Sequence, residues 1–205
     1  MNLANKLTLL RIFLVPVFLI FFLVEGIDYG TIVATIVFIV ASITDQLDGH
    51  IARSRNQITT FGKFMDPLAD KLLVTAVFVC LVQIGMIPAW AVIIILSREF
   101  AVSGLRSIAA SNGLVIAASW WGKIKTVTQM LAILLFLLTV NIMTIGNTNL
   151  LVNFFPGFLV ASNIVFYICV VITIISGIDY FIKNRKVITF DKWWFINKKY
   201  GNNKI

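Results

Sequence analysis

Charged side chains are scarce in this sequence: they make up 13% of its 205 residues, whereas apolar side chains make up 60%. A soluble domain of this length needs a far more polar surface, so the composition excludes one. Histidine and cysteine are scarcer still. One histidine, His50, cannot supply a histidine-based metal site. The two isolated cysteines, Cys80 and Cys169, give neither a disulfide framework nor a metal-ligand spacing.

Long apolar runs make up most of the chain. Six of them have roughly the 17–25 residues that a transmembrane helix needs. No small-residue cleavage site follows the first run, so we expect it to be retained as a helix. The sequence therefore predicts an all-α integral membrane protein, with six transmembrane helices in one bundle and a single domain over residues 1–205. The predicted spans are Leu7–Val24, Tyr29–Asp48, Phe64–Met86, Pro88–Ala110, Ile124–Ile145 and Phe158–Ile182.

The placement of the basic residues favours a membrane over a nucleic acid as the partner of this chain, whose net charge is +8. All 17 Lys and Arg residues lie at the N-terminus, around the second and fourth connections, or after the last span. The positive-inside rule then predicts a multi-pass protein of the cell membrane with both termini in the cytoplasm. Residues 189–205 mix Trp193, Trp194 and Phe195 with lysines, which predicts an interfacial tail on an anionic leaflet.

Four of the nine acidic residues gather in one stretch, "TDQLDGHIARSRNQITTFGKFMDPLAD", from Thr44 to Asp70. Asp45 and Asp48 lie roughly 24 and 28 Å from the outer end of the second span, at about 1.5 Å per residue. Asp70 and Asp66 lie roughly 24 and 30 Å from the outer end of the third. All four therefore fall in the cytoplasmic third of a bilayer core about 30 Å thick.

The spacing of these acids predicts a metal site that faces the cytoplasm. Asp45 and Asp48 share a helix face at i,i+3, and Asp66 and Asp70 share one at i,i+4. Four carboxylates this close would repel one another unless divalent cations lay between them, and all-oxygen ligands suit Mg²⁺ or Mn²⁺. The plainer alternative is four solvated loop acids near the membrane surface. Ionisable residues at this depth are usually functional, which favours the metal site.

The residues between the acids indicate what the metal would hold. Gly49 and Ala52 are small enough for a ligand to approach the backbone, and Arg53 offers a planar donor fork that fits phosphate. Metal-binding carboxylates beside an arginine are typical of phosphoryl chemistry, because the metal neutralises phosphate charge and lowers the pKa of an attacking hydroxyl.

This stretch resembles the signature of the CDP-alcohol phosphatidyltransferases. The match is Asp45-x2-Asp48-Gly49-x2-Ala52-Arg53-x8-Gly62-x3-Asp66-x3-Asp70, and it holds at every fixed position and spacing. The resemblance implies that the four aspartates hold two metal ions and that Asp45, Gly49, Ala52 and Arg53 help to bind CDP-diacylglycerol. It also implies that Asp70 is the base for an acceptor hydroxyl, which attacks the phosphate attached to diacylglycerol and releases CMP.

Two further features of the chain fit the same family. The N-terminal "NKLTLLR" resembles a family segment in which Asn5 and Thr8 would touch the nucleotide. A homodimer is also implied by the resemblance.

Basic residues of the fourth and fifth spans predict the acceptor. "SREFAVSGLR", Ser97–Arg106, and "GKIKT", Gly122–Thr126, resemble family members that use glycerol 3-phosphate. Arg98 lies roughly 15 Å from the outer end of its helix, where an unpaired arginine is unfavourable. Arg106 follows at i+8 on nearly the same face, and Lys123 and Lys125 begin the next helix. We expect these four residues to form a cationic pocket for the phosphate of glycerol 3-phosphate.

Alternatives remain open from the sequence. The basic residues would otherwise only mark the cytoplasmic boundary, and Glu99 would pair with a basic residue that the sequence does not identify. The acceptor would otherwise be inositol phosphate, serine or a lipid. A divalent-cation transporter would explain the aspartates, but Arg53 beside the ions would oppose cation passage, and the outer halves of the helices are almost wholly apolar. A purely structural membrane protein would leave the buried charges unexplained.

Overall fold

The structure, a computed structural model, describes residues 3–54, 60–111, 113–114, 116–117, 119–145 and 149–185. The side chains of residues 3–7, 45–54, 60–67, 70, 111, 145 and 149–154 lie outside this description. The described residues form helices and turns without any strand, which confirms the predicted all-α class. The helices are α1 (Leu3–Leu23), α2 (Gly30–Ser54), α3 (Thr60–Gln83), α4 (Ala89–Ser111), α5 (Trp120–Ile145) and α6 (Asn149–Lys183).

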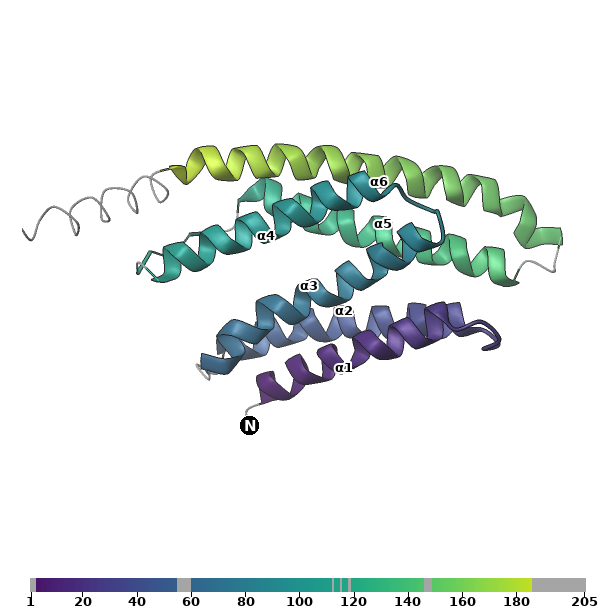
Figure 1. Ribbon diagram of the computed structural model, residues 1–205, viewed down its shortest axis with the longest axis horizontal. Helices are drawn as coiled ribbons and strands as arrows, with labels where there is room; N and C mark the ends of the chain where they lie inside the picture. The colour runs from purple at the N-terminus through teal and green to yellow at the C-terminus, as the bar shows by residue number, and fades with distance from the viewer. Residues whose placement is uncertain are drawn as a thin grey trace, which may run out of the picture.

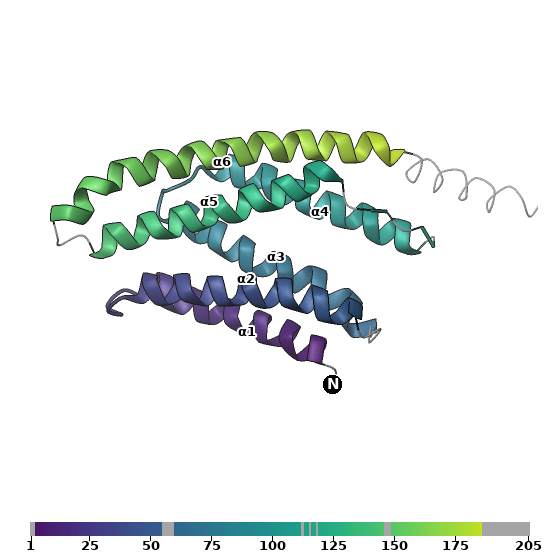
Figure 2. The ribbon, with the colours of Figure 1, turned by 180° about the vertical axis from the view of Figure 1, so that it is seen from behind.

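Successive helices run in opposite directions, as the short connections predict (Figure 1). The start of α1, the ends of α2, α4 and α6, and the start of α3 lie toward one end of the molecule, on the left in Figure 1 and on the right in Figure 2. The α1–α2 and α3–α4 connections and the facing ends of α5 and α6 lie toward the other end. The residues at this second end include no Lys or Arg. We call the first end the basic end.

The six helices divide into two groups of three. In both views α1, α2 and α3 lie below α4, α5 and α6. Within the groups, α1 packs on α2 and α3, and α6 packs on α4 and α5. Contacts of α5 with α2 and α3, and of α3 with α4, join the two groups. The junction between the groups is therefore built by α2, α3, α4 and α5, which carry most of the residues discussed below.

Five of the helices extend at least four residues beyond the predicted spans, and α2 and α6 extend furthest. The α2 helix continues past Asp48 to Ser54, and α6 begins at Asn149 rather than at Phe158. The apolar run that defines a span ends where the chain leaves the lipid, whereas the backbone hydrogen bonds of a helix continue into water. In α6 the early start places Pro156 inside the helix. Pro156 is the eighth residue of α6, so it removes one backbone hydrogen bond from inside the helix, a loss that membrane helices tolerate where neighbouring groups satisfy the freed carbonyl.

Glycines in the left-handed region end two of the helices. Gly85 follows α3 with a φ of 73° and donates its N–H to the carbonyl of Val82, at 3.0 Å. The N–H of Met86 reaches the carbonyl of Leu81, at 2.9 Å, and the two bonds together form a Schellman cap. Gly113 ends α4 in the same way, with a φ of 74°. Only glycine adopts this conformation without a Cβ penalty, which explains both turns.

Away from the basic end, buried aromatic side chains pack the helices against one another. The ring of Phe166 on α6 is fully buried, with its centroid 6.3 Å from that of Phe78 on α3 and 5.9 Å from that of Phe136 on α5. Both pairs adopt the edge-to-face geometry that aromatic quadrupoles favour. Phe18 of α1 and Phe38 of α2 are also fully buried and belong to the same cluster. The core therefore spans both groups of helices.

The outer faces of the helices are apolar. Large side chains such as Phe13, Ile93 and Val127 are 66%, 62% and 68% exposed. Soluble monomers rarely expose so much contiguous apolar surface, so this surface is suited to lipid. Among the described residues, two helical segments are long and apolar enough to cross a membrane by themselves, Trp120–Thr144 and Phe155–Lys183. The described parts of α1, α2 and α3 contain shorter apolar segments.

Candidate active site

The backbone places all eight fixed residues of the aspartate motif on two helices. Asp45 and Asp48 lie near the end of α2, and Asp66 and Asp70 lie near the start of α3. The remaining motif residues, Gly49, Ala52, Arg53 and Gly62, lie on the same two helices. Only residues 55–59 separate α2 from α3, so these two helix ends lie at the basic end of the molecule (Figure 1).

The side chains of all these motif residues lie outside the described residues, so the arrangement of the carboxylates stays a prediction. Among the side chains that are described, no three His, Cys, Asp or Glu cluster as metal ligands would. Whether these residues suit a metal is therefore judged from their chemistry. Four carboxylates on two adjoining helix ends supply the oxygen ligands that Mg²⁺ or Mn²⁺ prefers.

The N-terminal helix carries the two residues expected near the nucleotide. Asn5 and Thr8 both lie in the first turns of α1, at the basic end. The Thr8 side chain is 2% exposed, so it faces other helices rather than lipid. The side chain of Asn5 lies outside the described residues. The helix thus brings Thr8 inside the bundle at the end where the aspartates lie.

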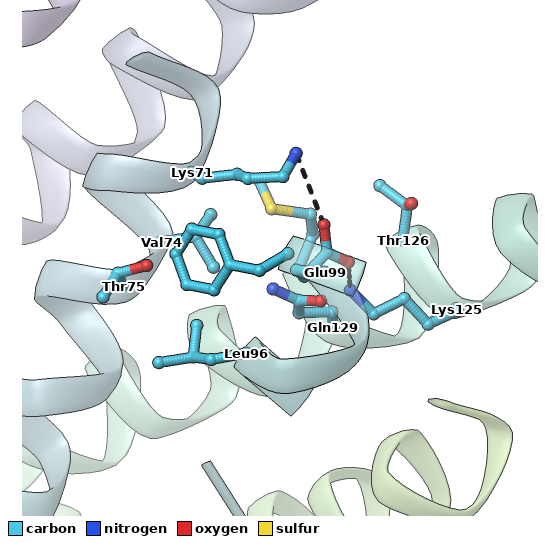
Figure 3. A pocket seen from close by; sticks show the side chains of 10 residues that line it. Lys71, Val74, Thr75, Leu96, Glu99, Lys125, Thr126 and Gln129 are labelled. Carbon is cyan, nitrogen blue, oxygen red and sulfur yellow. Dashed lines mark hydrogen bonds and ion pairs between the residues drawn. The ribbon is translucent and has the colours of Figure 1, made fainter. Parts of the chain in front are cut away.

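Glu99 of α4 is the centre of a cluster of charged side chains, which we call the Glu99 cluster (Figure 3). Its Oε1 accepts a hydrogen bond from the Lys125 ammonium of α5 and lies 3.4 Å from Nη1 of Arg98. Its Oε2 lies 3.6 Å from the ammonium nitrogen of Lys71 on α3. The sequence left the partner of Glu99 unidentified, and the structure supplies three. One carboxylate therefore connects basic residues of three helices.

Burial makes these contacts energetically important. The Lys125 side chain is 2% exposed, and those of Arg98, Lys71 and Glu99 are 12%, 17% and 19% exposed. Removing water weakens the screening between charges, so each attraction is stronger here than on a solvated surface. The loss of one partner would leave the other charges uncompensated, which is costly in a low-dielectric interior.

A cavity of about 70 Å³ lies beside the Glu99 cluster, between α3, α4 and α5 (Figure 3). Charged and polar residues line it together with apolar ones. The amide oxygen of Gln129 is buried and, among the described residues, has no hydrogen-bond partner. The lining residues are Lys71, Val74, Thr75, Leu96, Glu99, Phe100, Lys125, Thr126, Gln129 and Met130.

Arg98 lies between α4, α5 and α6 at a place where small residues make room for it. Its Nη2 donates to the Ser176 hydroxyl of α6, at 2.7 Å. A Cβ on Gly177 would lie 3.3 Å from Cγ of Arg98, and one on Gly122 would lie 3.5 Å from its Nη2. Its Nε is buried without a hydrogen-bond partner among the described residues. The guanidinium is therefore held on two sides and keeps one donor unused.

Arg106 contacts α6 one helical turn nearer the basic end than Arg98 does. Its Nε donates to the hydroxyl of Tyr180, at 3.2 Å, and its guanidinium carbon lies 5.6 Å from the centre of that ring. Arg98 and Arg106 are eight residues apart, roughly 12 Å along α4, whereas Ser176 and Tyr180 are four residues apart, roughly 6 Å along α6. The two arginine side chains therefore converge toward the same part of α6.

The structure thus brings together some of the residues expected in a cationic pocket. Arg98 and Lys125 share one oxygen of Glu99, and Arg106 lies one helical turn away along α6. Lys123 is exposed near the start of α5 and is absent from the contacts just described. The grouping of Arg98, Arg106 and Lys125 fits the predicted pocket, and the role of all four residues stays a prediction.

Sequence reasoning missed three residues that organise this region. Lys71 directly follows Asp70, and Ser176 and Tyr180 lie on α6. A usable signal existed for the last two, because a serine and a tyrosine stand one helical turn apart in a strongly apolar helix. For Lys71 no local pattern distinguishes a partner of Glu99 from a residue at the membrane boundary.

The chain belongs to the CDP-alcohol phosphatidyltransferase family. The family profile of that description matches residues 1–175, which include the aspartate motif, the Glu99 cluster and the first part of α6. The match confirms the family that the motif resembles.

Individual relatives are similar over most of the chain. A CDP-diacylglycerol–glycerol-3-phosphate 3-phosphatidyltransferase of Bacillus subtilis is 43% identical over 201 residues, which cover 91% of this chain and 97% of the relative. A probable phosphatidylglycerophosphate synthase of Mycobacterium tuberculosis is 40% identical over 87% of this chain and 79% of its own length. A Haemophilus influenzae protein with the same name as the Bacillus one is 39% identical over 87% of this chain and 91% of its own.

Proposed function

We propose that this chain transfers a phosphatidyl group from CDP-diacylglycerol to glycerol 3-phosphate, giving phosphatidylglycerophosphate and CMP. The observation that carries the proposal is the complete aspartate motif on α2 and α3 in a chain that is 43% identical to a relative named for this reaction. A basic group formed by Arg98, Arg106 and Lys125 near those helices supports an acceptor that carries its own phosphate.

Each residue has a defined part in this proposal. Asp45, Asp48, Asp66 and Asp70 hold two Mg²⁺ or Mn²⁺ ions, which when bound neutralise charge on the phosphates of CDP-diacylglycerol. Arg53 binds phosphate, and Gly49 and Ala52 leave room for the nucleotide beside α2. Asn5 and Thr8 contact the nucleotide from α1.

The reaction itself is a displacement at phosphorus. Asp70 accepts the proton of the acceptor hydroxyl, whose oxygen forms a bond to the phosphorus attached to diacylglycerol. The bond from that phosphorus to the bridging oxygen breaks, and the electron pair leaves with CMP. Arg98, Arg106, Lys123 and Lys125 hold the phosphate of the acceptor so that its hydroxyl lies near Asp70.

The proposal includes an orientation in the membrane. All six helices cross the cell membrane, with the basic end in the cytoplasm, and the chain acts as a homodimer. The absence of Lys and Arg at the opposite end supports this orientation. Glycerol 3-phosphate then reaches the site from the cytoplasm, and the CDP head group of the lipid faces the same side while its acyl chains stay in the bilayer.

Replacing Arg106 by Ala should raise the KM for glycerol 3-phosphate by about tenfold, because a charge-assisted hydrogen bond to the acceptor is lost. The KM for CDP-diacylglycerol and kcat should change little. Steady-state kinetics with each substrate varied separately measure this. Arg185→Ala is the matched control, since it removes another cation at the basic end that has no part in the proposed pocket. An unchanged acceptor KM in Arg106→Ala would remove Arg106 from the pocket.

An acceptor panel tests the proposed function. The purified protein in detergent receives CDP-diacylglycerol and Mg²⁺, and CMP release is followed with glycerol 3-phosphate, inositol phosphate, serine or phosphatidylglycerol. The proposal predicts release with glycerol 3-phosphate alone. Release with another acceptor would keep the aspartate chemistry and overturn the assignment of the basic pocket. No release with any acceptor from folded protein would favour a transport role for the aspartates.

A further inference from the structure

We propose that Glu99 is a positioning residue for the acceptor: it holds Lys125 and Arg98 in one arrangement and connects them through Lys71 to the helix that carries Asp66 and Asp70. This inference depends on the proposed function, because it assigns the Glu99 cluster to the acceptor side of that reaction.

Glu99 lies among three basic side chains, those of Lys125, Arg98 and Lys71. The two carboxylate oxygens of Glu99 have different partners. Oε1 contacts Lys125 and Arg98, and Oε2 lies near Lys71. Figure 3 shows the contacts with Lys125 and Lys71. Lys125 and Arg98 come from α5 and α4, and without an anion between them their charges would repel. The carboxylate is therefore what allows two buried cations to lie beside each other.

The contacts in the Glu99 cluster restrict the conformations of the Lys125 and Arg98 side chains. A lysine side chain has four rotatable bonds and reaches many positions when solvated. Lys125 is 2% exposed, with its ammonium group held on Glu99, so it occupies one of those positions. Arg98 is fixed by Ser176 as well as by Glu99. Groups fixed before a ligand arrives bind it with less loss of conformational entropy.

Two buried hydrogen-bonding atoms in and beside the Glu99 cluster have no partner among the described residues. One is the Nε of Arg98, a member of the cluster, and the other is the amide oxygen of Gln129, which lines the cavity together with Glu99. Nε is a donor that suits a phosphate oxygen, and the amide oxygen is an acceptor that suits a hydroxyl group. Glycerol 3-phosphate carries both kinds of group. The cavity of about 70 Å³ that Gln129, Glu99 and Lys125 help to line has room for a hydroxyl-sized group, and Arg98 lies outside its lining.

Glu99 is also connected to α3, the helix that carries Asp66 and Asp70. Lys71 directly follows Asp70 on α3, and its ammonium nitrogen lies 3.6 Å from Oε2 of Glu99. A rigid helix transmits the position of Lys71 to Asp70 on the same turn and to Asp66 on the turn before it. Glu99 thus joins the groups that would hold the acceptor to the group that would accept its proton, and it does so without itself touching either substrate.

Replacing Glu99 by Gln tests this role, because the amide keeps the shape of the carboxylate and removes its charge. We expect the KM for glycerol 3-phosphate to rise at least tenfold, while the KM for CDP-diacylglycerol stays within about twofold of the wild type. Glu99→Asp should recover part of the loss, since it restores the charge at a shorter reach. Glu25→Gln at the opposite end is the matched control and should leave both constants unchanged.

A second variant keeps the test decisive if Glu99→Gln does not fold. The double variant Glu99→Gln with Lys125→Gln removes the carboxylate and its most buried partner together. If Glu99 acts by positioning Lys125, the double variant and Lys125→Gln alone should have acceptor KM values within about threefold of each other. An acceptor KM more than about threefold higher in the double variant than in Lys125→Gln alone would show that Glu99 acts independently of Lys125 and would overturn the inference.

The outcomes separate the inference from the proposed function. Wild-type protein that releases no CMP with glycerol 3-phosphate contradicts the proposed function itself. Active wild-type protein with an unchanged or lowered acceptor KM in Glu99→Gln contradicts only the inference. A lowered KM would mean that Glu99 competes with the acceptor phosphate for Lys125. An equal rise in both KM values would indicate general damage to the site and would also overturn the positioning role.

Discussion

We expect Asp70→Asn to lower kcat by a factor of about 10²–10⁴, the range that general-base catalysis contributes, while CDP-diacylglycerol still binds. The amide cannot accept the proton of the acceptor hydroxyl, so the displacement at phosphorus loses its base. Three of the four carboxylates remain to hold metal, and Arg53 and the small residues of α2 remain to hold the nucleotide. Single-turnover CMP release measures the chemical step, and equilibrium binding of CDP-diacylglycerol measures the retained affinity.

A matched control separates this effect from a general loss of charge. Asp28 is an exposed carboxylate in the connection between α1 and α2, at the opposite end from the aspartate motif. Asp28→Asn makes the same chemical change and should leave turnover and binding as they are. Loss of CDP-diacylglycerol binding in Asp70→Asn, with normal turnover of the substrate that does bind, would contradict the role of Asp70 as base.

We expect removal of divalent cations to abolish CMP release, and addition of Mg²⁺ or Mn²⁺ to restore it. The reason is electrostatic, since four carboxylates and the phosphates of CDP-diacylglycerol cannot occupy one site without cations between them. Asp48→Ala should raise the metal concentration for half-maximal activity at least about tenfold, which is the lower range for losing even an outer-shell partner of a metal. Activity measured across a metal titration, after treatment with a chelator, tests both statements.

The controls for the metal prediction concern folding. Thermal unfolding of the chelated protein should show a folded helical bundle, because the described core of Phe18, Phe38, Phe78, Phe136 and Phe166 contains no metal ligand. Unchanged CMP release in excess chelator would contradict the metal site. An Asp48→Ala variant with the metal dependence of the wild type would remove Asp48 from the ligands.

The number and order of the described helices could be predicted from the sequence, because each apolar run has roughly the 17–25 residues of a helix across a bilayer. The helix ends were less predictable. The continuation of α2 to Ser54 and the early start of α6 at Asn149 fall in polar or proline-containing sequence that hydropathy does not assign to a span. Hydropathy identifies the segment that lies in lipid, whereas the helix ends are decided by backbone hydrogen bonds and caps such as the one at Gly85.

The candidate site was predictable to the extent that its residues are close in sequence. Asp45 to Asp70 follow helical spacing within one stretch, so the sequence alone identifies them as a group. The Glu99 cluster is different, because Glu99 and Lys125 are 26 positions apart and meet only when α4 packs near α5. The partners of Arg98 and Arg106 on α6 are 78 and 74 positions away. Such pairs depend on how helices rotate against one another, which periodicity does not determine.

An isotope experiment tests the central claim, that an acceptor hydroxyl attacks the phosphate attached to diacylglycerol. The purified protein would receive CDP-diacylglycerol, Mg²⁺ and glycerol 3-phosphate that carries a heavy oxygen isotope in its primary hydroxyl, and both products would be analysed by mass spectrometry. We predict that the heavy oxygen appears in the phosphatidylglycerophosphate formed and that the CMP carries none. Heavy oxygen in CMP, or CMP release without this labelled lipid, would contradict the proposed transfer.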